Sequence, residues 1–313
     1  MSVSSELHVV FGTGPLGLAV MRELIARGKL VRMVNRSGQA KVPGDVAVVQ
    51  ADAIDHASAR QACKEASVVY NCIGVDYTKW AEIWPSIMNG IIVGAASANA
   101  KLIFADNLYM YGPVSRPMTE DLPYAATTRK GRVRAQIANT LMEAHTSGKV
   151  RATIGRGSDF YGRGALVTAM GERVFSKALS GKAAGVIGNL DMPHTYTYIE
   201  DFGRGLVTLG EHEEALGEVW HIPNAETITT RQFLELVFKE AGKPFKVSVM
   251  PKVMVSILSL FVPVLREMKE MLYEFEEPFI VDHSKFERAF GANPTPHMQA
   301  IRQTLNWFRQ NTQ

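Results

Sequence analysis

A glycine-rich turn near the N-terminus constrains the fold more than any other feature of this sequence. The segment Gly12-Thr13-Gly14-Pro15-Leu16-Gly17 follows an apolar run at Leu7–Phe11, which predicts a strand, and precedes a helical pattern at Leu16–Arg27. A strand, a GxGxxG turn and a helix in this order are typical of dinucleotide-binding folds, in which the turn and the helix N-terminus hold the pyrophosphate. The cofactor-binding residues expected in this turn are Gly12, Gly14, Pro15, Leu16 and Gly17.

Short apolar runs alternate with helical patterns through the first 157 residues, which indicates βαβ units around a parallel sheet. The predicted strands are Leu7–Phe11, Leu30–Val34, Val46–Gln50, Val68–Cys72, Leu102–Ala105 and Val150–Ile154. The predicted helices are Leu16–Arg27, Ala57–Cys63, a segment within Trp80–Asn99, Thr127–His145, one that opens in the 230s after Thr229-Thr230, and Met298–Phe308. We expect an α/β protein with a Rossmann-type doubly wound parallel sheet and a smaller mixed C-terminal substrate region. We expect residues 1–157 to form the dinucleotide-binding domain, to which residues 196–225 return. Residues 158–195 and 226–313 are expected to form the substrate-binding region.

The end of the second predicted strand favours NADP(H) over NAD(H). NAD-binding proteins of this kind carry an acid there that accepts the ribose hydroxyls, whereas an arginine accommodates a 2′-phosphate. This chain reads Asn35-Arg36-Ser37, so Arg36 can pair with the phosphate, with hydrogen bonds from Asn35 and Ser37. The alternative interpretation of Arg36 is a solvated loop residue. Asp52, after the third strand, is a candidate for the adenine amino group or an ordinary turn aspartate.

Composition limits the partners and the compartment. Apolar residues make up 46% and charged residues 21% of the 313 residues, and the net charge is only +3, with Lys and Arg dispersed. This excludes a basic nucleic-acid-binding surface. Two cysteines, Cys63 and Cys72, are too few for a secreted disulfide scaffold, and no secretory signal precedes the first strand, so we expect a cytoplasmic protein.

Neither a membrane-spanning segment nor a metal site is expected. The most apolar stretch, Val253–Leu265, is too short to span a bilayer and predicts a buried helix or pocket wall. The eight histidines are dispersed, with no HExxH and no Cys/His cluster, so no metal site is predicted.

Several segments follow one another in the order and spacing of a known family. They are Val31–Arg36, Asn71–Gly74, Phe104–Gly112, Arg156–Gly162, Tyr196–Asp201 and Pro294–Arg309. Together they resemble the short-chain dehydrogenase/reductases, in the extended or atypical branch that includes NAD-dependent epimerases/dehydratases and NmrA-like proteins. The resemblance spans essentially the whole chain. It implies a Rossmann-type domain whose cofactor passes Cys72 and Gly74 in the loop after the fourth strand.

The catalytic residues of that family are missing. The family places a Ser or Thr before a Tyr-Gly, and a Tyr-x-x-x-Lys in the next helix, where the lysine lowers the pKa of the tyrosine. Matching Tyr111 to the Tyr-Gly places Asn107 at the serine, and matching the helix places Thr127 at the tyrosine and Gly131 at the lysine. The glycine turn is also one residue shorter than the family's GxxGxxG.

Three nearby residues can replace the missing groups. The amide of Asn107 can hold a substrate carbonyl oxygen. Tyr111 can donate a proton if a cation such as Lys130 lowers its pKa, and Lys130 can reach the nicotinamide ribose. The alternative is that Tyr111 packs under the sheet and Lys130 is solvated. The candidate substrate-binding residues are Tyr109, Asp159, Tyr161 and His194, each of which can equally be a structural residue.

Three functions remain open. The first is an NADP(H)-dependent oxidoreductase of the atypical short-chain type that acts on a carbonyl or alcohol and lacks the Tyr-x-x-x-Lys pair. The second is an NADP(H)-binding redox sensor without turnover, and the third is a sugar-nucleotide epimerase or dehydratase. The Met-rich and aromatic C-terminal half predicts a small-molecule, hydrophobic substrate. We expect a monomer or a homodimer.

Overall fold

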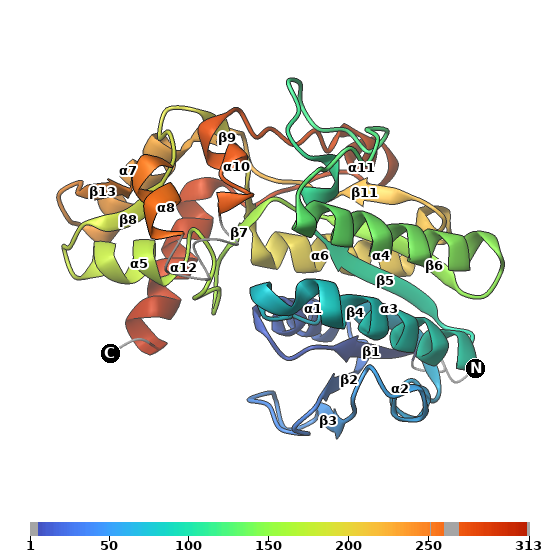
Figure 1. Cartoon of the computed structure of the whole chain (residues 1–313). Coiled ribbons are helices and arrows are strands. Elements are labelled where there is room, and N and C mark those ends of the chain that lie inside the picture. Colours follow the sequence, from blue (N-terminus) through green and yellow to red (C-terminus); the bar gives the residue numbers. More distant parts are fainter. Residues whose placement is uncertain (1–5, 251, 260–268, 312–313) are drawn as a thin grey trace.

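A seven-stranded parallel sheet forms the centre of the computed structural model, which describes residues 6–250, 252–259 and 269–311. Its strands are β1 (Leu7–Phe11), β2 (Leu30–Asn35), β3 (Ala47–Gln50), β4 (Ala66–Asn71), β5 (Lys101–Asp106), β6 (Arg151–Arg156) and β11 (Val219–His221). They lie in the order β11-β6-β5-β4-β1-β2-β3, and every neighbouring pair is parallel (Figure 1). The prediction of a Rossmann-type, doubly wound α/β fold is confirmed.

Helices cover both faces of this sheet, which is why its strands are apolar runs without alternation. α1 (Pro15–Ala26) and α6 (Ile199–Glu211) pack together on one face, where Val10, Leu24 and Phe202 belong to one buried cluster. α2 (His56–Ala62), α3 (Trp80–Ser97) and α4 (Arg129–Thr146) cover the other face (Figure 1). α1 begins at a proline, whose missing N–H needs no partner in a first helical turn.

The chain leaves the sheet after β6 and later returns to it. β7 (Asp159–Tyr161) pairs in parallel with β10 (Tyr196–Tyr198), which leads directly into α6. β11 then pairs in parallel with β6 and forms the outer strand of the sheet. The loops that follow β6 therefore lie beside the carboxyl ends of β1, β4 and β5.

A second, smaller part of the molecule gathers the C-terminal helices and short strand pairs on one side of the sheet (Figure 1). Its elements are α5 (Glu172–Leu179), β8 (Ala184–Ile187), β9 (Pro193–His194), β12 (Ile228–Thr229), α7 (Thr230–Ala241), β13 (Val247–Met250), α8 (Lys252–Leu258), α10 (Tyr273–Glu276) and α12 (His297–Asn311). α5, α7 and α12 share a buried cluster with Phe175, Phe233 and Phe308. A capping box between Thr229 and Gln232 starts α7, as the Thr229-Thr230 signal predicts. α11 (Ser284–Phe290) packs instead against β11.

The apolar stretch at Val253–Leu265 is buried only in part over its described residues, since Val255 is 1% exposed. Val253 and Met254 in α8 are 70% and 49% exposed, so for these two residues the prediction of burial is wrong. Residues 260–265 of the stretch lie outside the described residues. Among the helices that the structure describes, none combines the length and the apolar character needed to cross a membrane.

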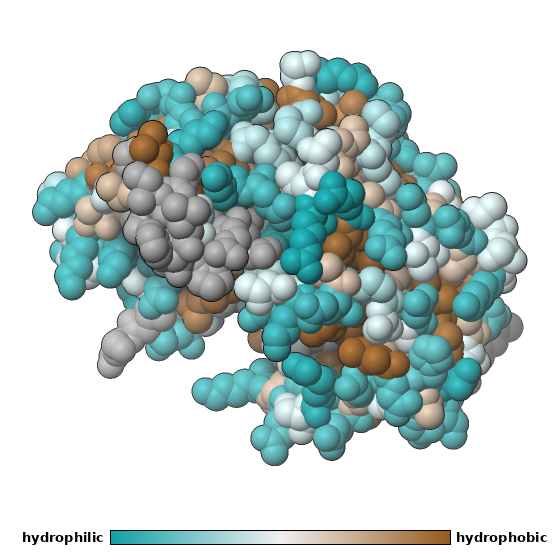
Figure 2. Space-filling model, viewed as in Figure 1, coloured by the Kyte–Doolittle hydropathy of each residue, from teal (hydrophilic) through white to brown (hydrophobic). Residues whose placement is uncertain are grey.

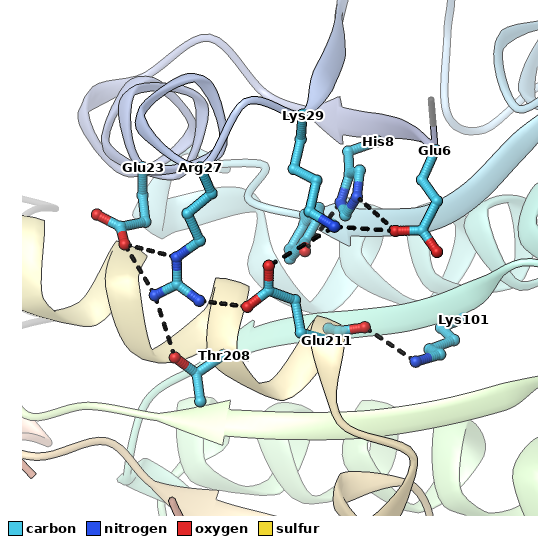
Figure 3. Close-up of polar contacts among 10 residues, drawn as sticks. Glu6, His8, Glu23, Arg27, Lys29, Lys101, Thr208 and Glu211 are labelled. Atoms are coloured by element: carbon cyan, nitrogen blue, oxygen red, sulfur yellow. Dashed lines mark hydrogen bonds and ion pairs between the residues drawn. The ribbon is translucent and has the colours of Figure 1, made fainter. Parts of the chain in front are cut away.

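Ion pairs occupy the amino edge of the sheet (Figure 3). Lys29 Nζ lies 3.0 Å from Glu6 Oε2, and Lys101 Nζ lies 2.9 Å from Glu213 Oε1. Arg27 pairs with Glu211 at the end of α6, which ties that helix to the end of α1. His8 is buried among these charges and its Nδ1 lies 3.2 Å from the hydroxyl of Tyr70. A hollow of about 530 Å³ at this edge is lined by charged side chains, among them Glu6, Lys101 and Glu211.

Candidate functional site

A cleft of about 470 Å³ lies at the carboxyl edge of the sheet, where the strand order reverses between β1 and β4. In doubly wound sheets this is the position where ligands bind. Figure 2 shows the surface indented between the part that holds the sheet and the part that holds α5 and α12. The described lining comes from the ends of β4, β5 and β6, the start of α1, the loop 164–168 and the segment around α10.

The glycine turn has the geometry that a dinucleotide requires. Gly12 has a φ of +101°, and a Cβ there would lie 2.5 Å from the carbonyl oxygen of Cys72. A Cβ on Gly17 would lie 1.9 Å from the carbonyl oxygen of Gly12, so both positions need glycine. Gly14 differs, because nothing lies within 4 Å of its Cβ position and it lines the cleft at the N-cap of α1. The N-terminus of α1, with Pro15 and Leu16, thus opens onto free space that fits a pyrophosphate.

The remaining cofactor candidates divide into two groups. Cys72 and Gly74 line the cleft, whereas Asn35, Arg36, Ser37 and Asp52 are not part of its described lining. Asn35 is held beside the glycine turn, since its Nδ2 donates to Thr13 Oγ1 at 2.8 Å. Arg36 and Ser37 are exposed on the loop that follows β2.

Asp52 behaves as a turn residue in this structure. Its Oδ1 accepts from the backbone N–H of Ile54 at 3.0 Å, and its side chain is exposed. This is the contact of an Asx turn, which the alternative interpretation of Asp52 predicts.

Of the three proposed catalytic residues, only Asn107 lines the cleft. Asn107 follows β5, and its Oδ1 accepts from the backbone N–H of Tyr109 at 3.2 Å. That bond orients the amide and makes its NH2 end the donating end toward a ligand. The described lining includes neither Tyr111 nor Lys130.

Tyr111 is buried, and the net shift of its pKa is upward, in contrast to the expected lowering by a cation such as Lys130. Its hydroxyl accepts from Arg156 Nη1 at 2.6 Å and lies 2.9 Å from His221 Nε2. Burial raises the pKa of Tyr111 to about 12, although Arg156 acts in the opposite direction. Burial and Arg156 also lower the pKa of His221 to about 3, so His221 is neutral and accepts from the tyrosine.

Lys130 is buried against aromatic rings rather than solvated. Its side chain is 2% exposed, and Nζ lies 4.0 Å from the centre of the Tyr77 ring and 3.7 Å from Glu270 Oε1. Neither the proposed contact with Tyr111 nor the alternative of a solvated lysine describes this position.

The candidate substrate residues also divide. Tyr109 and Asp159 line the cleft. Tyr161 does not, because it packs in the core of the second part, with its ring centre 4.9 Å from that of Phe233. His194 lies behind the lining, where its Nε2 is 2.8 Å from Asp159 Oδ2. The structure thus brings together Asn107, Tyr109 and Asp159.

Three charged residues of the lining, Asp106, Arg134 and Glu274, are absent from the candidates chosen from sequence. Arg134 projects from α4, with its guanidinium 4.1 Å from the centre of the Trp80 ring. It lies four residues after Lys130, and this spacing is the signal that both occupy the buried face of the helix. Glu274 comes from α10, far along the chain. In the sequence it is marked only as an acidic residue within an apolar, aromatic segment. Within the described ranges, no three His, Cys, Asp or Glu side chains are grouped as metal ligands.

Comparisons with known proteins agree with this architecture. A model of the NAD dependent epimerase/dehydratase family matches residues 9–222. No curated protein sequence is similar enough to match. Among solved structures, UDP-glucuronic acid 4-epimerase from Bacillus cereus in complex with NAD has a TM-score of 0.79 at 16% identity, with 98% of this chain and 100% of that chain covered.

Two further solved structures give the same result. For dTDP-glucose 4,6-dehydratase from Bacillus anthracis in complex with NAD, the TM-score is 0.80 at 13% identity, with 98% of this chain and 97% of that chain covered. For a nucleoside-diphosphate-sugar epimerase from Pseudomonas aeruginosa, it is 0.79 at 16% identity, with 99% of each chain covered. At these identities the likeness shows a shared fold.

Proposed function

This chain belongs to the NAD dependent epimerase/dehydratase family, and from that premise we propose that it is an NADP(H)-dependent oxidoreductase acting on the carbonyl or alcohol group of a small molecule. Membership confirms the resemblance to extended short-chain dehydrogenase/reductases that the sequence motifs indicate. The observation that carries the proposal is the open space over Gly14, at the N-terminus of α1, which is continuous with a cleft lined by polar groups.

Residues of this chain fit a nicotinamide dinucleotide along that cleft. The N-terminus of α1 with Gly14 and Pro15 would hold the pyrophosphate, and Cys72 and Gly74 would flank the cofactor beyond it. Two solved structures with this fold are complexes with NAD, which supports this class of cofactor. When bound, such a cofactor supplies or accepts a hydride. NADP(H) is favoured over NAD(H) because the exposed Arg36 stands where an acid would bind the ribose hydroxyls.

The chain's own residues would bind and orient the substrate. The amide NH2 of Asn107 would donate to the oxygen of the reacting carbonyl, and Tyr109 and Asp159 would contact neighbouring polar groups. Apolar side chains, Ile73, Phe160 and Phe279, form the walls around these groups and exclude water. Exclusion of water strengthens each hydrogen bond to the reacting oxygen.

A sugar-nucleotide epimerase or dehydratase is the second candidate, and the similar solved structures favour it. Against it stands the sequence, in which no tyrosine is followed four residues later by a lysine. The two free, buried cysteines support a reducing compartment such as the cytoplasm. We retain a monomer or homodimer as the proposed state.

Cofactor titration and turnover together test the proposal. The purified chain is titrated calorimetrically with NADPH and NADH, and NADPH oxidation is then followed with a panel of aldehydes, ketones and quinones. Turnover of any carbonyl supports the oxidoreductase. Tight binding of NADPH without turnover supports the redox sensor instead, and conversion of UDP-sugars or dTDP-sugars supports the epimerase. Absence of dinucleotide binding contradicts all three.

A further inference from the structure

Glu274 is a buried acid of the cleft lining, and the proposed function leaves it without a role. It lies in α10, is 1% exposed and belongs to the cleft lining. Among the residues that the structure describes, its Oε1 has no hydrogen-bond partner. Buried polar atoms are nearly always paired, because an unpaired one loses its hydration without compensation. An unpaired carboxyl oxygen beside a ligand cleft therefore indicates a contact that a ligand completes.

The backbone around Glu274 is held by contacts from the segment that contains Asn189 and His194. His194 Nδ1 lies 3.1 Å from the backbone carbonyl oxygen of Glu274, and His194 Nε2 lies 2.8 Å from Asp159 Oδ2. The next residue, Phe275, accepts from the backbone N–H of Asn189 at 2.7 Å. The imidazole thus lies between the carboxylate of Asp159 and the backbone of Glu274 as one rigid group. Such support is what a catalytic side chain needs to hold its geometry.

The surroundings of Glu274 also determine which group can release a proton. Burial raises the pKa of Glu274 well above its ordinary value, and the nearby carboxylate of Asp159 raises it further. Burial also raises the pKa of Tyr109 well above its ordinary value. In the family arrangement a lysine makes a phenol the proton donor. In this cleft burial favours the protonated form of both groups, and a carboxylic acid is intrinsically the stronger acid of the two.

We propose that Glu274, as a neutral carboxylic acid, is the catalytic proton donor of the cleft and protonates the carbonyl oxygen of the substrate. This role rests on the proposed oxidoreductase function. As the carbonyl carbon receives a hydride from a reduced nicotinamide dinucleotide, the π electron pair of the C=O bond moves to oxygen and forms the new O–H bond. The Glu274 O–H bond breaks and its electron pair remains on the carboxylate, which regains a proton from water. One carbonyl, one hydride and one proton give one alcohol.

The test compares Glu274→Gln with the matched control Glu277→Gln. Glutamine has the size of glutamate but no acidic proton, and Glu277 is an exposed acid of the same segment. Infrared spectroscopy of the protein without ligand is the first measurement. The carbonyl band of a protonated carboxylic acid is expected at neutral pH in the wild type and in Glu277→Gln, and is lost in Glu274→Gln. A wild type and a Glu274→Gln variant with the same spectrum in this region overturn the proposal.

The second measurement is the rate of NADPH oxidation with the panel of carbonyl compounds. Loss of the proton donor should lower the rate about a hundredfold or more in Glu274→Gln, while NADPH binding by calorimetry is unchanged. Glu277→Gln should keep the wild-type rate. Glu274→Asp, which keeps an acidic proton one methylene further back, should retain more activity than Glu274→Gln, and the reverse order overturns the proposal.

The outcomes distinguish a failure of the role proposed for Glu274 from a failure of the proposed oxidoreductase function. If the wild type reduces a carbonyl and Glu274→Gln matches its rate, the role of Glu274 is wrong and the oxidoreductase function stands. If the wild type binds NADPH and reduces no carbonyl of the panel, the oxidoreductase function is wrong and the role that rests on it is overturned with it. Circular dichroism of both glutamine variants verifies that the fold is retained.

Discussion

Arg134 Nη1 lies 3.2 Å from Asp106 Oδ1 at the floor of the cleft. Arg156 approaches the other oxygen of the same carboxylate, with its Nε 3.4 Å from Oδ2. All three side chains are buried, and Arg156 also donates to the hydroxyl of Tyr111. Asp106 therefore connects an arginine that lines the cleft to the polar network under β5, β6 and β11.

Replacement of Asp106 by alanine should destabilise the protein strongly. Two buried guanidinium groups would lose their shared carboxylate, and removal of one partner of a buried ion pair costs roughly 3–5 kcal/mol. Urea unfolding measures this loss. The control is Asp121→Ala, because Asp121 is an exposed acid whose contact with Arg116 spans 4.0 Å. A loss for Asp106→Ala no larger than that of the control would refute the structural role.

The variant Gly14→Val should lose dinucleotide binding and keep its fold. A Cβ there meets no protein atom within 4 Å, so we expect the fold to tolerate valine, whose side chain would fill the space assigned to the pyrophosphate. Calorimetric titration with NADPH and circular dichroism give the two readouts. Gly44→Val is the matched control, since its Cβ position is equally open and it does not belong to the described cleft lining. Normal NADPH binding by Gly14→Val would mean that the phosphate site is misplaced.

Arg36→Ala should weaken binding of NADPH and leave NADH nearly unaffected. A hydrogen bond to a charged group contributes about 1.5–3 kcal/mol, so the affinity for NADPH should fall at least about tenfold. Both cofactors are titrated against the variant and against Arg309→Ala, an exposed arginine on α12. Equal losses for NADPH and NADH, or no loss for either, would contradict the assignment of Arg36 to the 2′-phosphate.

Stability should fall as the pH falls from about 6.5 to about 4, in part because of His8. Burial lowers the pKa of His8 to about 4, and the charge of Lys29 acts in the same direction, against Glu6 and Glu211 (Figure 3). In this window the unfolded chain binds a proton that the folded protein does not, so the free energy of unfolding decreases as the pH falls. Its full contribution is present above pH 6.5.

The variant His8→Gln isolates this contribution. Glutamine can contact the Tyr70 hydroxyl but gains no proton, so the slope of stability with pH should become shallower by up to about 1.4 kcal/mol per pH unit. Urea unfolding at several pH values measures the slope, with the exposed His56→Gln as control. An unchanged slope in His8→Gln would show that another group causes the acid sensitivity.

Local pattern was enough to predict most of the sheet. β1 begins and ends where the apolar run Leu7–Phe11 predicts, and the run Leu30–Val34 falls one residue short of β2. These strands are covered on both faces, so burial alone makes them visible in the sequence. No strand is predicted at Val219–His221, because three residues carry too little pattern and their pairing with β6 depends on a distant segment.

The site was less predictable because it depends on directions that local pattern does not encode. Tyr109 and Tyr111 lie in one short 3₁₀ turn, in which side chains two positions apart point in different directions. Tyr109 therefore reaches the cleft, and Tyr111 enters the buried network with Arg156. Glu274 reaches the cleft only through the packing of α10 against β9, which no local pattern reveals.

The contribution of α10 to the cleft has a consequence for the order in which the protein is made. All strands of the sheet have been synthesised once His221 is added, and the cleft wall around Gly14 and Gly74 is built from this earlier part. Glu274 and Phe279 are added more than fifty residues later. Because chains fold from the N-terminal end during translation, the phosphate-binding turn can form on the ribosome before Glu274 has been added. Under the proposed function, a nascent chain would thus acquire its pyrophosphate site earlier than its proton donor.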